Sequence, residues 1–287
     1  MERLLTVVAT AACLALALFA LERRRPLRRP SRELGGRLLV NLAFSAFALA
    51  AATLLVRPVV EASLGRNATQ PLGLVHVVPL DSSLRAVLAF LLMDLSFYYW
   101  HLLNHRVPLL WRFHNVHHVD PDLDVSTALR FHFGELALSA GFRLVQILAI
   151  GISPWTYAAY ELAFQGNTLF HHSNLRLPIR LERALNKLLV TPRMHGIHHS
   201  HVRDETNSNY GVVFPWWDRI HRTLGLNVPQ SAITIGVPGY SRPEDNRLGN
   251  ALWMPFRKQR DYWRRPDGSS VRRDEDLGQA DRHRMAE

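Results

Sequence analysis

The chain has 287 residues, 48% of them hydrophobic, with a formal net charge of +10 and a single cysteine. One cysteine excludes an intrachain disulfide and any zinc or iron–sulfur site built from cysteines. The positive charge would suit a nucleic-acid-binding protein, but arginines that flank apolar segments favour a membrane surface, so we expect no nucleic-acid partner.

Two apolar segments near the N-terminus are long enough to cross a bilayer. Residues 4–21 form the first, and seven arginines follow between Arg23 and Arg37. This order favours an uncleaved helix over a signal peptide and places the arginine-rich segment in the cytoplasm. Residues 38–56 form the second, and we expect residues 57–83, which contain few basic residues, to be a loop on the opposite side.

A third apolar span is predicted for residues 84–104, after a helix start at residues 81–83, and it would return to the cytoplasmic side. Asp94 lies inside this span, where an acid is costly and usually has a partner. We expect Asp94 either to orient the imidazole of His101, seven residues later on the same face, or to form a hydrogen bond between helices. The sequence favours the two roles equally.

A helical hairpin is predicted for residues 135–170. It would break at residues 151–154, where proline follows serine, as is typical of a helix start. Arg143 and Glu161 are expected to pair across it. The second arm would deliver His171 and His172 to the same membrane face as the end of the third span.

Three clusters of histidines have helical spacing. His101 and His105 are four residues apart, and two further clusters have the form His-x-x-His-His, at residues 114–118 and 195–199. Residues three and four apart lie on one face of a helix, so each cluster would point its imidazoles in one direction. A lone buried histidine is usually a hydrogen-bonded core residue, but independent structural roles for eight clustered histidines are improbable.

The number of clustered histidines exceeds what one metal ion can bind, so two metals are the economical interpretation. All-nitrogen ligation suits iron, zinc, copper or nickel. The acids near the histidines do not form the ExxH pattern of carboxylate-rich di-iron bundles, and the HExxH pattern of zinc proteases is absent. A metal pair beneath an apolar bundle points to oxygen activation on a lipid, whereas a hydrolase would more typically recruit a carboxylate base.

The fold predicted from these elements is an all-α, polytopic membrane bundle of three spans plus a hairpin. A cytoplasmic helical cap would carry the multi-histidine dimetal site. We divide the chain into N-terminal membrane helices (residues 1–83), a histidine-bearing catalytic domain (84–225) and a cytoplasmic tail (226–287). The tail is rich in charge and poor in apolar residues toward its end, where we expect disorder. No sequence feature assigns an oligomeric state.

Four motifs give the chain a resemblance to a known family. They are DLSFYYWHLLNHRVPLLWRFHNVHH, RFHFGE, NTLFHHSN and MHGIHHSHVRDETNSNYG, in that order. The chain resembles, over residues 84–224, the fatty acid hydroxylase/sterol desaturase superfamily of membrane proteins. The resemblance implies an O2-dependent di-iron oxidase that acts on a C–H bond of a lipid such as a fatty acyl chain, a sterol or an isoprenoid. It leaves hydroxylation and desaturation open.

The resemblance also implies the site residues and the partners. The ligands would be His101, His105, His114, His117, His118, His171 or His172 or both, His195, His198 and His199. Residues that support the ligands would be Asp94, His132, Glu135, Asn207 and Asn209, with Asn167 at a position where some branches of the family have a histidine. Electrons would come from a separate electron-transfer protein, and other transition metals such as zinc could occupy the site in vitro. The alternatives are a membrane metal-binding protein without redox activity and a scaffold whose metals only fold it.

Overall fold

The computed structural model describes residues 2–273, with side chains from residue 12 onward, and these residues are helical with no strand among them. The helices are α1 (Glu2–Arg24), α2 (Leu34–Ala51), α3 (Arg57–Thr69), α4 (Ser82–Arg106), α5 (Pro108–His118), α6 (Phe133–Ile150), α7 (Pro154–His172), α8 (Ile179–Leu185), α9 (Pro192–His198), α10 (Arg203–Thr206), α11 (Trp216–Ile220) and α12 (Leu248–Trp253). A π-helical turn (Ala52–Val56) joins α2 to α3, and short 3-10 turns include η3 (Val125–Leu129) and η4 (Gln230–Ala232). The prediction of an all-α fold is confirmed for the described residues.

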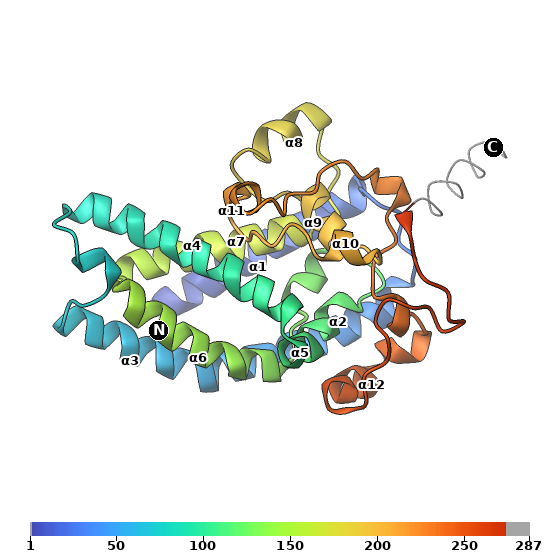
Figure 1. Ribbon diagram of the computed structural model, residues 1–287, viewed down its shortest axis with the longest axis horizontal. Coiled ribbons are helices and arrows are strands. Elements are labelled where there is room, and N and C mark those ends of the chain that lie inside the picture. The colour runs from blue at the N-terminus through green and yellow to red at the C-terminus, as the bar shows by residue number, and fades with distance from the viewer. Residues whose placement is uncertain (1, 274–287) are drawn as a thin grey trace.

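The long helices lie alongside one another as an elongated bundle, and the short helices α8 to α12 gather toward one end of it (Figure 1). Helix α6 packs against α2, α3 and α4, while α7 packs against α1, α4 and α9. Met93, Phe97, Ile147 and Tyr160 belong to the buried core that joins α4, α6 and α7. The C-terminal ends of α4 and α7 therefore point toward the short helices, and this arrangement positions the site.

Among the described residues, three helical stretches are long and apolar enough to cross a membrane: Leu34–His76, which includes α2 and α3, Ser82–Arg106 and Phe133–Ile150. Large apolar side chains such as Leu39, Leu54 and Val145 are exposed on them, as lipid-facing residues would be. The first predicted span, residues 4–21, is helical within α1, but the side chains of residues 1–11 lie outside the described part of the chain. That this segment crosses a membrane stays a prediction, as does a membrane-embedded hairpin of α6 and α7.

The prediction of a loop at residues 57–83 is wrong for its first part, because residues 57–69 form α3, which continues the preceding helix. Proline in a helix interior lacks an N–H and clashes with the carbonyl four residues earlier. Here Pro58 lies in the first turn of α3, directly after the π-helical turn, where the helix can accommodate it. The amide of Asn67 then donates to the Ile147 carbonyl at 2.9 Å and attaches α3 to α6. The polar composition of α3 hid a helix that packs on its neighbours.

Other boundaries agree with the sequence. Asp81 caps α4 by accepting from the backbone N–H groups of Ser83 and Leu84, which confirms the helix start. Helix α6 ends at Gly151, whose φ of 80° is the left-handed conformation that glycine adopts easily, and Ser153 caps α7. Arg143 and Glu161 form the expected ion pair between α6 and α7.

The C-terminal part of the chain packs onto the rest. Val237, Tyr240 and Met254 share a buried cluster with Phe44 of α2 and Trp111 of α5. The predicted boundaries at residues 83 and 225 stay predictions. The sequence predicts disorder for residues 266–287, but residues 266–273 are described and Arg273 pairs with Glu205. Residues 274–287 lie outside the described residues, so the expectation for them stays a prediction.

Candidate metal centre

Nine histidines converge where the ends of α4 and α7 meet α5 and α9. The first group consists of His101, His105, His114, His118 and His198, and the second group consists of His117, His172, His195 and His199. Within each group, one ring nitrogen per residue can be chosen so that these nitrogens all lie within 4.8 Å of one another. The three clusters of the sequence therefore come together, as predicted, and the structure divides their histidines between two adjoining groups.

Helical spacing explains how the clusters divide. On α5, His114 and His118 are four residues apart and join the first group, whereas His117 joins the second. On α9 the division is reversed, because His195 and His199 join the second group and His198 the first. Neighbouring residues of a helix point about 100° apart, so His117 and His118 reach different groups. Each short helix thus contributes to both.

Hydrogen bonds fix the rings of several ligand candidates. The Nδ1 atom of His101 lies 2.9 Å from the Tyr210 carbonyl, that of His198 2.7 Å from the Ser208 carbonyl, and that of His172 2.8 Å from the Thr168 carbonyl. A carbonyl oxygen can only accept, so in each case Nδ1 carries the proton and Nε2 keeps its lone pair. This is how proteins orient imidazoles that bind metal through Nε2.

Glu135 supplies a carboxylate to the same system. Its Oε1 atom lies 3.0 Å from Nδ1 of His114, and both side chains are buried. Because a carboxylate that accepts from a ligand imidazole raises the basicity of that ligand, Glu135 acts on the first group through His114.

Four Nε2 atoms of the first group lack hydrogen-bond partners in the part of the chain that the structure describes, in contrast to the Nδ1 atoms described above. The Nε2 atoms of His105, His114, His118 and His198 are buried and have no partner among the described residues. Leaving buried polar atoms unpaired is costly, and four such atoms in one place indicate a missing ligand. A metal ion that accepts their lone pairs fits this arrangement.

The second group brings its Nε2 atoms into contact. His172 Nε2 lies 3.1 Å from His117 Nε2 and 3.0 Å from His195 Nε2, and His195 Nε2 lies 3.1 Å from His199 Nε2. Since His172 donates through Nδ1, its Nε2 can only accept. Two nitrogens bound to one ion at about 2.1 Å and at right angles would be about 3.0 Å apart, so these contacts also fit a shared cation.

The environment keeps the imidazoles neutral. Burial, and then the neighbouring imidazoles, lower the pKa of His118 and His199 well below its ordinary value. The same two causes lower the pKa of His117 and His195. A neutral imidazole is the form that binds metal, so the lowered pKa values keep these four histidines ready to bind metal at neutral pH.

His171 belongs to neither group, although its ring centroid lies 4.1 Å from that of His195, so its role as a ligand stays a prediction. Its Nδ1 atom lies 3.3 Å from the amide nitrogen of Asn167. Because His171 and His172 are consecutive in α7, they point in different directions, and His172 is the one that faces the centre. The same amide of Asn167 donates to the Val212 carbonyl at 2.6 Å, so Asn167 holds a neighbouring loop.

Asp94 orients no imidazole. Its carboxylate accepts from Trp217 Nε1 at 2.8 Å, from the backbone of Phe214 at 3.1 Å and Val213 at 3.3 Å, and from the Tyr160 hydroxyl at 3.4 Å. Seven residues along a helix correspond to about 10.5 Å, too far for this side chain to reach His101. The alternative role, a hydrogen bond between segments, describes these contacts.

The remaining supporting residues act on the backbone. His132 accepts from the Gly134 N–H and lies 3.1 Å from the Leu252 carbonyl, so it caps α6. Asn207 donates to the Arg203 carbonyl at 2.9 Å, and Asn209, with φ of 54°, donates to the Met194 carbonyl at 2.9 Å. Neither asparagine contacts a histidine in these hydrogen bonds.

The groups that orient His101 and His198 were missed by the sequence analysis, because they are main-chain carbonyls of residues 208 and 210. Asp218 stabilises this segment by accepting from the backbone of Tyr210 and Gly211, both at 2.8 Å. Every residue has a main-chain carbonyl, so the residue types do not reveal which carbonyls will orient a histidine. The only signal in the sequence was the concentration of polar residues at 204–210.

Comparisons with known proteins agree with this geometry. Residues 86–223 match the fatty acid hydroxylase family. The chain is 32% identical to human alkylglycerol monooxygenase over 51% of its own length and 32% of that protein. It is 30% identical to an ornithine lipid hydroxylase of Rhizobium tropici, over 54% of this chain and 46% of the relative. Human cholesterol 25-hydroxylase is 30% identical, over 47% of this chain and 48% of the relative.

The matched region spans between a third and a half of these relatives. No solved structure matches the chain significantly. The match to the family contains all nine histidines that the structure brings together. This histidine-bearing part of the chain is therefore similar in sequence to the fatty acid hydroxylase family.

Proposed function

We propose that the protein is a multi-pass membrane oxidoreductase that uses O2 and two iron ions to oxidise a C–H bond of a lipid. The observation that carries the proposal is the pair of adjoining histidine groups at the end of an apolar bundle. The names of the relatives, which include a monooxygenase and two lipid or sterol hydroxylases, support a lipid substrate. The proposed oxidation of a C–H bond could take place equally well on an acyl, sterol, isoprenoid or alkyl chain.

The chain's own residues would hold and shape the site. The first group offers five imidazoles and the second offers four, a donor set that suits iron and also accepts zinc. When bound, the ions would supply the capacity to activate O2 with electrons from outside. The carbonyls of residues 168, 208 and 210 and the carboxylate of Glu135 would keep the ligand nitrogens directed at them. Burial of the rings would exclude bulk water.

The histidine groups would lie at the cytoplasmic side. The arginine-rich segment at residues 23–37 adjoins the same end of the bundle, and positive residues favour the cytoplasmic face. A separate electron-transfer protein would dock there, and the basic surface favours an acidic donor.

The test uses purified full-length protein in lipid nanodiscs. We expect about two irons per chain by elemental analysis, and lipids that gain one oxygen atom or lose two hydrogen atoms when O2 and a reductant are supplied. His114→Ala should lose both metal and oxidation. His221→Ala is the matched control, since His221 bonds to Tyr99 and to a backbone carbonyl outside both groups.

Three results would contradict the proposal. Wild-type protein that retains no metal after reconstitution would remove the enzyme hypothesis. Tight metal binding without oxidation of any lipid would instead support a metal-binding protein. Chelation that unfolds the protein, with no oxidation before it, would support a scaffold.

A further inference from the structure

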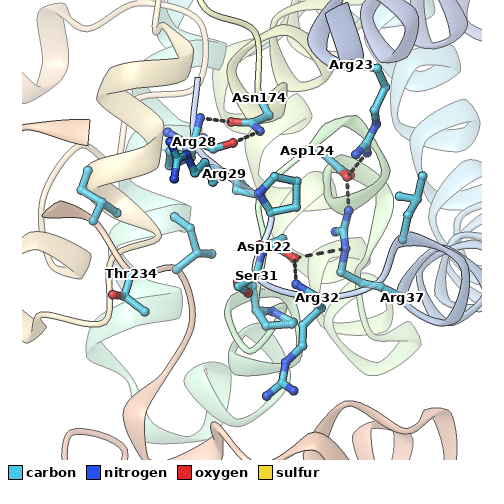
Figure 2. A pocket seen from close by; sticks show the side chains of 16 residues that line it. Arg23, Arg28, Arg29, Ser31, Arg32, Arg37, Asp122, Asp124, Asn174 and Thr234 are labelled. Carbon is cyan, nitrogen blue, oxygen red and sulfur yellow. Dashed lines mark hydrogen bonds and ion pairs between the residues drawn. The ribbon is translucent and has the colours of Figure 1, made fainter. Parts of the chain in front are cut away.

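A cavity of about 150 Å³ lies beneath the segment that connects α1 to α2, opposite the loop that follows α5 (Figure 2). This volume would hold about five water molecules at roughly 30 Å³ each. Its charged lining consists of Arg23, Arg28, Arg29, Arg32, Arg37, Asp122 and Asp124. Arginines therefore outnumber aspartates around a space of the size of a small polar group.

Two of the arginines are already neutralised. Arg23 pairs with Asp124 at 2.6 Å, and Arg37 pairs with Asp120 at 3.0 Å and with Asp124. The second lining carboxylate, that of Asp122, accepts from the backbone of Ser31 at 2.7 Å and of Arg32 at 3.1 Å. The acids of the lining are thus engaged, and they leave Arg28, Arg29 and Arg32 without a carboxylate within hydrogen-bond distance in the described part of the chain.

Arg28 is the buried member of these three. It is 9% exposed, and its Nη1 atom donates to the Gln230 amide oxygen at 2.6 Å. Its Nε and Nη2 atoms have no acceptor among the described residues. Burial lowers the pKa of Arg28 to about 10, because water is removed from its charge. A buried guanidinium with idle donors indicates that an anion belongs nearby.

Exposed arginines and apolar side chains line the mouth of the cavity. Arg29 and Arg32 are exposed, and Figure 2 shows Arg32 extended away from the carboxylates. Leu34, Leu123 and Ile233 add apolar lining beside them. A ligand with a phosphate group attached to an apolar body would match both parts.

The position in the fold selects the source of that ligand. The connecting segment leads directly into the apolar helix that begins at Leu34. The ends of membrane-spanning helices lie at the level of lipid headgroups. We propose that this cavity binds the phosphate of an anionic phospholipid headgroup, with Arg29 and Arg32 closing over it. The site does not depend on which lipid the metal centre oxidises.

Two residues that line the cavity, Arg28 and Asn174, connect it to the segments that carry the histidines. The Nη1 atom of Arg28 would lie 2.2 Å from a Cβ atom at Gly196, which stands between His195 and His198 on α9. A side chain at position 196 would therefore have to displace the Arg28 guanidinium. Asn174, two residues after His172, accepts from the backbone N–H of Arg28 at 2.9 Å and donates to its carbonyl at 2.8 Å. A bound headgroup would therefore stabilise the segment that carries His172 and the cluster at residues 195–199.

The experiment measures lipid retention by the metal-loaded full chain in detergent, using native mass spectrometry. Phosphatidic acid and phosphatidylcholine are offered separately, with inorganic phosphate as a competitor. We expect one phosphatidic acid to be retained in preference to phosphatidylcholine. Arg29→Gln/Arg32→Gln should weaken retention by about tenfold. Arg180→Gln/Arg183→Gln is the matched control, because it removes the same charge from two exposed positions of α8.

Each outcome decides the proposal. Selective loss in the first double variant supports the site, and competition by inorganic phosphate would show that the phosphate group is what it recognises. Equal losses in both double variants would mean only a diffuse attraction to the basic surface and would overturn the proposal. Equal retention of the two lipids, or binding of inorganic phosphate without retention of phosphatidic acid, would overturn it as well. Lipid oxidation is not measured, so failure here is separable from failure of the proposed function.

Discussion

The two histidine groups differ in how their rings are held. In the first group, His101, His114 and His198 each have Nδ1 hydrogen-bonded to a carbonyl or carboxylate. In the second group only His172 has such an anchor, while the Nδ1 atoms of His117, His195 and His199 are buried without partners in the described residues. Hydrogen bonds therefore fix more of the rings in the first group than in the second. If both groups bind metal as proposed, the second would depend more on its ion for order.

Ring packing replaces hydrogen bonds in the second group. His117 stacks on Phe131 with ring centroids 4.7 Å apart, and His199 stacks on His118 with centroids 4.3 Å apart. Stacking holds the plane of a ring but does not fix which nitrogen carries the proton. We therefore expect the ion of the second group to be the more easily removed.

The largest effect should come from two adjacent residues of α7. His172→Gln removes a member of the second group, so we expect the loss of about one ion per chain and a fall in oxidation of more than about 100-fold. His171→Gln changes a residue that lies in neither group, and we expect both ions to remain. Metal content and lipid product formation measure the difference. Equal loss in the two variants would break the assignment of His172.

A smaller effect should follow from removing an anchor of the first group. Glu135→Gln keeps the shape of the side chain but removes the charge that faces His114, so we expect about 10- to 100-fold weaker metal binding there. Titration of metal-loaded protein with a chelator should release the second-group ion first in the wild type. In the variant the two ions should be released at more similar chelator concentrations. Unchanged steps would show that the anchors do not distinguish the groups.

The smallest effect on the metal should come from Asp94, which lies outside both groups. Asp94→Ala leaves buried N–H donors of residues 213, 214 and 217 without an acceptor, so the free energy of unfolding should fall by about 3 kcal/mol. Asp94→Asn keeps one acceptor and should lose less. Thermal unfolding measures stability, and metal content at low temperature should stay at the wild-type value. A loss of metal in folded Asp94→Ala protein would restore Asp94 to the site.

The sequence predicted the features that repeat along a helix. The i, i+3, i+4 spacing at residues 114–118 and 195–199 sufficed to foresee that these imidazoles meet, and Asp81 sufficed for the start of α4. Spacing could not divide the clusters between two groups. That division depends on how α5 and α9 are rotated against each other, which long-range packing sets.

Other features had no counterpart in residue types. Helix α3 was hidden because its residues are polar and its stability comes from packing on α6 through contacts such as that of Asn67. The choice of His172 over His171 depends on the direction of α7. The roles of the carbonyls at residues 208 and 210 depend on a loop that Asp218 and Asn209 shape.

The sharing of α5 and α9 between the two groups limits how this part of the chain can vary in length. One residue inserted between His114 and His117 would turn the following ligands by about 100° and withdraw them from both groups together. Insertions at the exposed residues Lys187 and Leu188, between α8 and α9, would leave every ligand candidate facing as before. Related chains should therefore keep the spacing within each cluster fixed, while the distances between clusters are free to drift.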